Sequence, residues 1–302
     1  MKGKVKILRK YNQRYKNFSF SELMTKADEE YLETIMEMDE KGNLLSESKF
    51  DPEGELEEKN SYIYDADGRL LEHVLLFALE DVTEKRVLKR NEKGMLLEET
   101  KYYGDDSGER SEYAYNEKDE VVEIKNYDED GEYVWSEYFS YDSDGSLTEK
   151  VKKDREGQIQ EHVKFVLTDP KSVIEEHDLK PDGSLNVKTV MEFNEKGKEI
   201  VSKQYTADGK LIAAVLTEYD ENGNVSEKKY RDFYSKTLRF TYDENNNMTS
   251  QELFDGTGLL LRKNVYEYDD NGNMLTEQNF ELDAARGGKD KHHGARFEYE
   301  YF

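Results

Sequence analysis

Cysteine is absent from the 302 residues, and only three prolines are present. The lack of cysteine excludes a disulfide-stapled fold, thiolate metal sites and thiol catalysis. No apolar run approaches the roughly 18 residues that a membrane-spanning helix needs, so the sequence predicts no membrane span. Basic residues are also few, with 44 Lys and Arg against 69 Asp and Glu and a net charge of −25. This balance argues against nucleic acid as the main ligand, because a phosphate backbone calls for a basic surface.

Hydrophobic residues make up only 35% of the chain, whereas charged residues make up 37%. Such a composition usually indicates disorder. The aromatic content opposes that interpretation, since 22 Tyr and 13 Phe are many for a disordered chain. We therefore expect a folded protein whose apolar residues are concentrated on a few surfaces.

One seven-residue motif recurs along the chain: an aromatic residue, Asp or Asn, two variable residues, Gly, one variable residue and Leu. Copies are YDADGRL at 64–70, YDSDGSL at 141–147 and YDENGNV at 219–225, and the spacings of the glycines alternate between 12 and 14 to give a period of 26. Asp119 and Asn246 replace the glycine in two copies. Because Gly, Asn and Asp tolerate positive φ best, the motif predicts a type I turn closed by a left-handed Gly bulge.

Each interval between turns has room for one strand of about eight residues. The sequence therefore predicts an all-β fold, a long antiparallel β-meander of repeated hairpins with about 26 residues per two strands. We expect roughly 20 strands in a coiled or single-sheet ribbon. Since both spacings are even, Trp135 and Phe139 should lie on an aromatic, aliphatic face and Lys150 and Lys152 on an opposite, mostly charged face.

The N-terminal segment differs from the repeat. Residues 1–21 are basic, and apolar residues within 20–31 recur at helical spacing, with Ser19 or Ser21 as an N-cap. The predicted domains are a basic N-terminal arm with this short helix over 1–30 and a β-hairpin repeat domain over 31–302. No apolar stretch follows the basic start as in a secretory signal peptide. We expect a cytoplasmic protein, or one exported without such a peptide.

The run YIYDADGRL at 62–70 resembles the tyrosine–aspartate (YD) repeat of Rhs and teneurin proteins, and FTYDENNNM at 240–248 and YEYDDNGNM at 266–274 are further copies. The resemblance covers about residues 38–280. It implies a β-hairpin ribbon wound into a shell, which in that family often surrounds a toxic cargo domain. This chain has a longer period, mostly lacks the Arg after Gly and shows no self-cleaving aspartyl core. The resemblance therefore supports the ribbon more than encapsulation.

One turn has the residue types of a calcium-binding loop. Asn126, Asp128, Asp130 and Glu137 around Gly131 fit the spacing of an EF-hand loop. That loop requires flanking helices, whereas the flanking residues here alternate as in strands. The structural turn is the favoured interpretation, and the sequence predicts no catalytic, metal or cofactor site.

Charge separation suggests where a partner would bind. The partner-binding candidates are Lys2, Lys4, Lys6, Arg9, Lys10, Arg14 and Lys16 in the arm, and His292 and His293 in a predicted loop at 286–296. The arm could dock on the chain's own acidic sheet, on another subunit during assembly, or on an anionic partner. Docking on protein is favoured, since the acidic repeats are present at high local concentration.

The chain lacks a nucleophile elbow, a Walker A loop, a Rossmann fingerprint and a zinc-protease motif. We therefore do not expect an enzyme. The main hypothesis is a non-catalytic β-repeat protein-binding or scaffold module, immunity-, antitoxin- or adaptor-like, whose acidic surface engages a basic protein partner. One alternative is an Rhs-like shell or cargo-handling component of a secretion or injection system. The other is a carbohydrate-active or carbohydrate-binding protein that uses paired carboxylates or its tyrosines.

Overall fold

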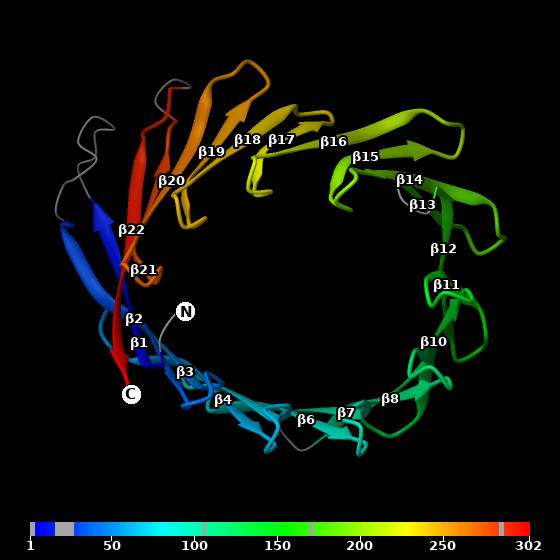
Figure 1. Ribbon diagram of the computed structural model, residues 1–302. Helices are drawn as coiled ribbons and strands as arrows, with labels where there is room; N and C mark the ends of the chain where they lie inside the picture. Colours follow the sequence, from blue (N-terminus) through cyan, green and yellow to red (C-terminus); the bar gives the residue numbers. More distant parts are fainter. Residues whose placement is uncertain (1–3, 16–26, 105–106, 170–171, 284–286) are drawn as a thin grey trace. The chain divides into compact units, whose positions relative to one another are not determined.

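The computed structural model describes residues 4–15, 27–104, 107–169, 172–283 and 287–302, and its secondary structure there consists of β-strands (Figure 1). The strands are β1 (Val5–Tyr15), β2 (Glu29–Met38), β3 (Leu44–Phe50), β4 (Leu56–Tyr64), β5 (Leu70–Phe77), β6 (Val82–Arg90), β7 (Leu96–Tyr103), β8 (Ser107–Tyr115), β9 (Val121–Tyr127), β10 (Tyr133–Tyr141), β11 (Leu147–Asp154), β12 (Ile159–Asp169), β13 (Val173–Leu179), β14 (Leu185–Phe193), β15 (Glu199–Thr206), β16 (Leu211–Tyr219), β17 (Val225–Arg231), β18 (Lys236–Tyr242), β19 (Met248–Asp255), β20 (Leu260–Tyr268), β21 (Met274–Glu281) and β22 (Lys291–Tyr301).

The turns between strands have the predicted chemistry. At the turn from β10 to β11, Gly145 has a φ of 84°, and its N–H donates to the carbonyl of Asp142 at 3.2 Å. The Asp142 carboxylate accepts hydrogen bonds from the N–H groups of Asp144 and Ser146, each at 2.9 Å. Asp119 and Asn246 have φ values of 64°. The turn prediction is therefore confirmed at these positions.

Besides the left-handed bulge predicted in the turn itself, each of these hairpins contains a second bulge, in the strand after the turn, which was not predicted. Tyr141 lies opposite Leu147 and Ser140 lies opposite Glu149, so Thr148 between them has no paired residue. The extra residue reverses the alternation of faces between one strand and the next.

The predicted division into an aromatic face and a charged face is therefore wrong. Lys150 lies opposite Phe139, and its Nζ is 2.8 Å from Glu137 Oε1. Lys152 lies with its Nζ 4.4 Å from the ring centroid of Trp135. Cations and aromatic rings thus share one face of β10 and β11 and stabilise it by cross-strand contacts.

Contacts divide the chain into two compact units. The first comprises Met1–Ile63, Val74–Val82 and Thr217–Phe302, and the second comprises Tyr64–His73 and Thr83–Leu216. In the second unit, antiparallel pairing runs in chain order from β6 to β16. In the first unit, β17 to β22 pair in chain order, β22 pairs with β1, and β1 to β4 continue the ladder.

The pairing of the first strand with the last corrects the predicted ribbon. A ribbon would leave β1 and β22 as free edges, but Val5–Tyr15 pairs along its length with residues 292–301, and its other edge pairs with β2. The meander is thus closed at its two ends, which removes the edges that promote aggregation. The helix expected over 20–31 is also wrong where it can be checked, because residues 29–31 begin β2. Its residues 20–26 lie outside the described part.

Few apolar side chains are fully buried in the described residues. The largest group lies at the junction of the chain ends, where Val5, Leu8 and Met38 form a cluster against Phe297 and Tyr299. Elsewhere the sheet is held by its backbone ladder, cross-strand ion pairs and tyrosine hydroxyls. The junction is therefore the part of the first unit in which apolar burial contributes most.

Candidate functional site

The hairpin tip between β17 and β18 is unlike the other described turns. Ser235 stands where the repeat places Gly, Asn or Asp, and β17 pairs with β18 without a bulge. The tip instead carries Phe233 and Tyr234, whose side chains are 94% and 81% exposed. Their ring centroids lie 5.8 Å apart. Two neighbouring aromatic side chains thus project from the end of this hairpin into solvent.

The backbone of the tip is held in place from two sides. The carboxylate of Asp232 accepts a hydrogen bond from the Tyr234 N–H at 2.8 Å. Gly256, in the turn between β19 and β20, lies against Ser235 so closely that an added Cβ would be 3.2 Å from the Ser235 Cβ and carbonyl oxygen. Glycine at this position therefore lets the neighbouring turn support the tip.

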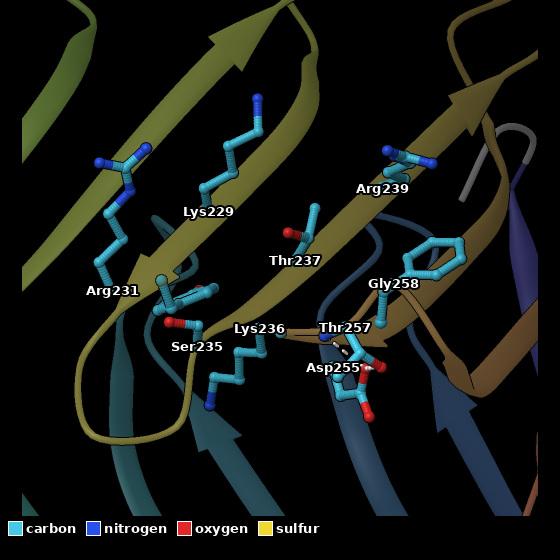
Figure 2. A pocket seen from close by; sticks show the side chains of 12 residues that line it. Lys229, Arg231, Ser235, Lys236, Thr237, Arg239, Asp255, Thr257 and Gly258 are labelled. Atoms are coloured by element: carbon cyan, nitrogen blue, oxygen red, sulfur yellow. Dashed lines mark hydrogen bonds between the residues drawn. The ribbon is translucent and has the colours of Figure 1, made fainter.

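A shallow hollow of about 410 Å³ lies beside the tip (Figure 2). Its lining includes Lys229 and Arg231 from β17, Arg239 from β18, Phe254 from β19 and Thr257 from the turn after β19. Two of the cations are neutralised. Lys229 Nζ is 2.9 Å from Glu218 Oε1 and also contacts Glu227.

Arg239 completes this charge cluster. Its Nε is 2.9 Å from Glu227 Oε2, and its guanidinium carbon lies 4.9 Å from the Phe254 ring centroid. Hydrogen bonds from Lys229 and then Arg239 lower the pKa of Glu227 below its ordinary value. The inner part of the hollow is thus a closed ion-pair network, in which neither cation is free for a ligand.

Arg231 and Lys236, which flank the tip, form no ion pair with any residue in the described ranges. Lys236 Nζ lies 5.0 Å from the ring centroid of Tyr230, and both flanking cations are exposed. The candidate site is therefore two exposed aromatic rings with an unneutralised cation on either side. This arrangement can bind an apolar or anionic surface, but it lacks a nucleophile held by a base.

The calcium candidates occupy a regular turn and its two strands. Asn126 in β9 donates to Ser111 Oγ at 3.3 Å, and Glu137 in β10 pairs with Lys150. Asp128 Oδ1 accepts from the N–H groups of Asp130 and Glu132 at 3.1 and 2.8 Å. Across the described chain, no three His, Asp or Glu side chains converge as a metal ion would require. These four residues have local partners instead of a common centre.

The described basic residues of the N-terminal segment lie in or beside a strand of the sheet and not in an arm. Lys6, Arg9, Lys10 and Arg14 lie in β1, whereas Lys4 is exposed just before it and Lys2 and Lys16 fall outside the described residues. Lys10 Nζ is 2.6 Å from Glu33 Oε2, Arg9 is 3.6 Å from Glu300, and Lys6 is 3.9 Å from the same carboxylate. Arg14 lies 5.6 Å from the Tyr31 ring centroid. The predicted assembly through an N-terminal arm is therefore wrong, because both edges of β1 are occupied within the chain.

The two histidines lie in β22 and not in a loop. The His292 ring is stacked between Tyr15 and Phe280, with centroid distances of 3.7 and 4.3 Å, and is 4% exposed. Burial, with a smaller effect of the charge on His293, lowers the pKa of His292 to about 4. His293 is exposed opposite Arg14. The structure therefore places His292 in a packed seam and leaves only His293 accessible.

Sequence reasoning missed the tip residues Arg231, Phe233, Tyr234 and Lys236. One signal could have found them: position 235 is a turn slot by its spacing of 12 from Gly223, yet it holds Ser. This turn has lost the left-handed residue of the repeat and has gained two aromatic residues. A turn does not need aromatic residues to form, so their presence suggests another role.

The predicted absence of a membrane span is corrected. It rested on the length of apolar runs, a criterion for helices, and the described chain is built of strands, to which this criterion does not apply. None of the described residues forms a helix long and apolar enough to cross a membrane. The expected basic protein partner is also not retained, since charges on the sheet are paired with one another across strands. The fold does not favour a cytoplasmic location over export.

No protein-family model matches the sequence, and no curated protein matches it. Among solved structures, a porin-like protein from Bacteroides uniformis is similar with a TM-score of 0.36 at 10% identity, over 98% of this chain and 96% of that one. A complex of TcdB2, TccC3 and Cdc42 has a TM-score of 0.31 at 9% identity, over 83% of this chain and 18% of that one. A TcdB2–TccC3 structure has a TM-score of 0.31 at 9% identity, over 91% and 20%. At these scores the similarities establish neither a family nor a function for this chain.

Proposed function

We propose that the chain is a non-catalytic β-repeat scaffold that contacts its partner through the tip between β17 and β18. The observation that carries this proposal is the exposure of Phe233 and Tyr234, at 94% and 81%. Exposing large aromatic rings to water is unfavourable in free energy, and covering them with a binding partner relieves this. At regular turns such as 142–146, by contrast, Asp and Gly complete the turn by themselves.

The rest of the sheet supports a scaffold role because several of its tyrosines make hydrogen bonds within the sheet. Tyr115 and Tyr141 donate hydrogen bonds to the backbone carbonyls of Leu96 and Val121 at 2.7 and 2.8 Å. Tyr242 makes the same contact with Val225 at 2.9 Å. These tyrosines hold neighbouring strands together, which favours a structural role for them over sugar stacking.

The acidity of the carboxylates supports the non-catalytic part of the proposal. A general acid needs a raised pKa, as in the glycosidases. For eleven described carboxylates the pKa is lowered, and hydrogen bonds are the leading lowering cause. The residues are Glu33, Asp39, Asp65, Glu149, Glu175, Asp182, Asp208, Asp220, Glu227, Asp269 and Glu298. Such carboxylates remain ionised and serve the turns and ion pairs.

Site-specific photo-crosslinking in the producing cells tests the proposed contact. A photoreactive amino acid at position 233 should give a defined adduct, identified by mass, whereas the same group at Asn222 in the regular turn between β16 and β17 should not. The substitution Tyr234→Ser should weaken the adduct at 233, because it removes half of the aromatic surface. Equal adducts at positions 222 and 233, or none at 233, would contradict the proposal.

A further inference from the structure

We infer that the tip between β17 and β18 docks on an anionic lipid surface. This inference rests on the proposed function and names the class of its partner. The carrying observation is the combination of Phe233 and Tyr234, both exposed, with Arg231 and Lys236, which flank them without an ion pair in the described chain. Each part of the combination matches one layer of a membrane interface.

The aromatic rings suit the boundary between headgroups and acyl chains. Tyr and Trp gather at that level because the ring is apolar and its polar group remains hydrated. Phe233 supplies a purely apolar ring beside Tyr234, and the two centroids are 5.8 Å apart. Both rings can therefore enter the interface together from one hairpin end.

The flanking cations suit the phosphate and carboxylate groups above that boundary. Arg231 precedes the tip and Lys236 follows it, so each lies within a few residues of a ring. Their neighbours Lys229 and Arg239 are neutralised by Glu218 and Glu227. Charge complementarity at the tip is thus local and comes from these two residues.

The net charge of −25 does not prevent this contact at physiological salt. The Debye length there is about 8 Å, so acidic residues farther than this from the membrane are largely screened. Arg231 and Lys236 would be in contact with the headgroups and are screened much less. The distant acidic strands therefore repel the membrane only weakly at the tip, where residues 231–236 carry two cations and one acid, Asp232.

The tip is also ordered before it meets a surface. Asp232 holds the Tyr234 N–H, and the close approach of Gly256 supports Ser235. A preordered hairpin loses little conformational entropy on docking, so the rings and cations can act without a folding step.

Vesicle flotation of the full chain tests the inference. The probes are vesicles of phosphatidylcholine alone and of phosphatidylcholine with phosphatidylserine, at physiological salt. The wild-type chain should float with the anionic vesicles. The double variant Arg231→Gln with Lys236→Gln should bind these vesicles more than tenfold more weakly, because each cation contributes a factor of about five. Phe233→Ser with Tyr234→Ser should abolish binding to the anionic vesicles.

Two controls make the outcome decisive. Lys41→Gln with Lys210→Gln removes the same charge from regular turns and should leave binding unchanged, and the thermal unfolding midpoint checks that each variant folds. Absence of flotation of the wild-type chain, or equal flotation of the Arg231 and Lys236 variant, would overturn the inference. A protein adduct at position 233 in cells, without flotation, would overturn the lipid assignment and leave the proposed function standing.

Discussion

The hydroxyl of Tyr268 donates a hydrogen bond to the backbone carbonyl of Met248 at 2.8 Å. The two residues lie at the open end of the hairpin formed by β19 and β20, opposite its turn. Tyr299 makes the equivalent contact with the carbonyl of Met274 at 2.8 Å. Each tyrosine thus links the two strands of one hairpin at the end opposite the turn. Tyr268 is the aromatic residue of the motif copy at 268–274, so this contact gives a reason for Tyr instead of Phe there.

Tyr268→Phe should destabilise the fold because it leaves the Met248 carbonyl without this donor. We expect a loss of about 0.5–1.5 kcal/mol in the free energy of unfolding, measured by urea denaturation. Tyr230→Phe is the matched control, since no hydroxyl contact of Tyr230 is seen in the described residues. A loss of the same size in both variants would show that the hydroxyl contact is not the cause.

The turn glycines should tolerate Asn far better than Ala. Gly209 has a φ of 83° and nothing within 4 Å of an added Cβ, so backbone conformation alone decides the effect. Gly209→Ala should cost about 1–2 kcal/mol of unfolding free energy in urea denaturation. Gly209→Asn should cost less, since Asn246 adopts a φ of 64° in the same slot. Equal losses would contradict the left-handed turn as the reason for the motif.

The turns could be predicted from the sequence because their chemistry is local. Asp142, Gly145 and the backbone between them complete the turn without help from distant residues. The bulge at Thr148 could not be predicted, because the unpaired residue needs no special side chain. One extra residue was enough to place Lys150 beside Glu137 on the face assigned to the aromatic residues.

The pairing of β1 with β22 also could not be predicted from the sequence pattern. Tyr11 and Glu298 share a hydrogen bond at 3.0 Å across a separation of 287 residues. The alternation of side chains in β1 is the same whether its second edge is free or paired. Residues 5–15 therefore contain no signal that predicts pairing with β22. For the candidate site, the charge pattern predicted partner binding by the basic residues now found in β1. The feature that distinguishes the site is instead Ser235, which replaces the usual left-handed turn residue.

An engineered disulfide tests the pairing of β1 with β22. The chain has no cysteine of its own, so Arg9→Cys with Glu298→Cys introduces a single possible bridge. These residues are directly opposite, and opposed Cα atoms lie about 4.5–5.5 Å apart, within the range of a disulfide. The oxidised double variant should migrate as a cross-linked monomer on non-reducing gels.

The matched control for this bridge is Arg9→Cys with Ser48→Cys. Ser48 lies opposite Ile35, which is itself opposite Arg9, so the two cysteines are two strands apart. At about 4.8 Å per strand they are beyond the reach of a disulfide. Cross-linking in the control but not in the test pair would contradict the pairing of the chain ends.

Acid should weaken the seam around His292. Its pKa is lowered to about 4 in the fold, first by burial, so the unfolded chain with an ordinary pKa near 6.5 binds the proton at higher pH. The free energy of unfolding should therefore fall as the pH decreases from about 6.5 to about 4. His292→Phe keeps a ring between Tyr15 and Phe280 and should flatten this part of the pH profile. Parallel profiles for the two chains between pH 6.5 and 4.5, above the titration of most carboxylates, would contradict the assignment.

Tryptophan fluorescence at the tip tests the central claim most directly. The single tryptophan, Trp135, is first replaced by Phe, and Phe233→Trp then places the only indole at the tip. With vesicles containing phosphatidylserine, the emission should shift to shorter wavelength as the indole leaves water, whereas Asn222→Trp in the same background should not shift. Emission from position 233 that stays at the wavelength of a water-exposed indole at saturating vesicles would contradict the docking of this tip.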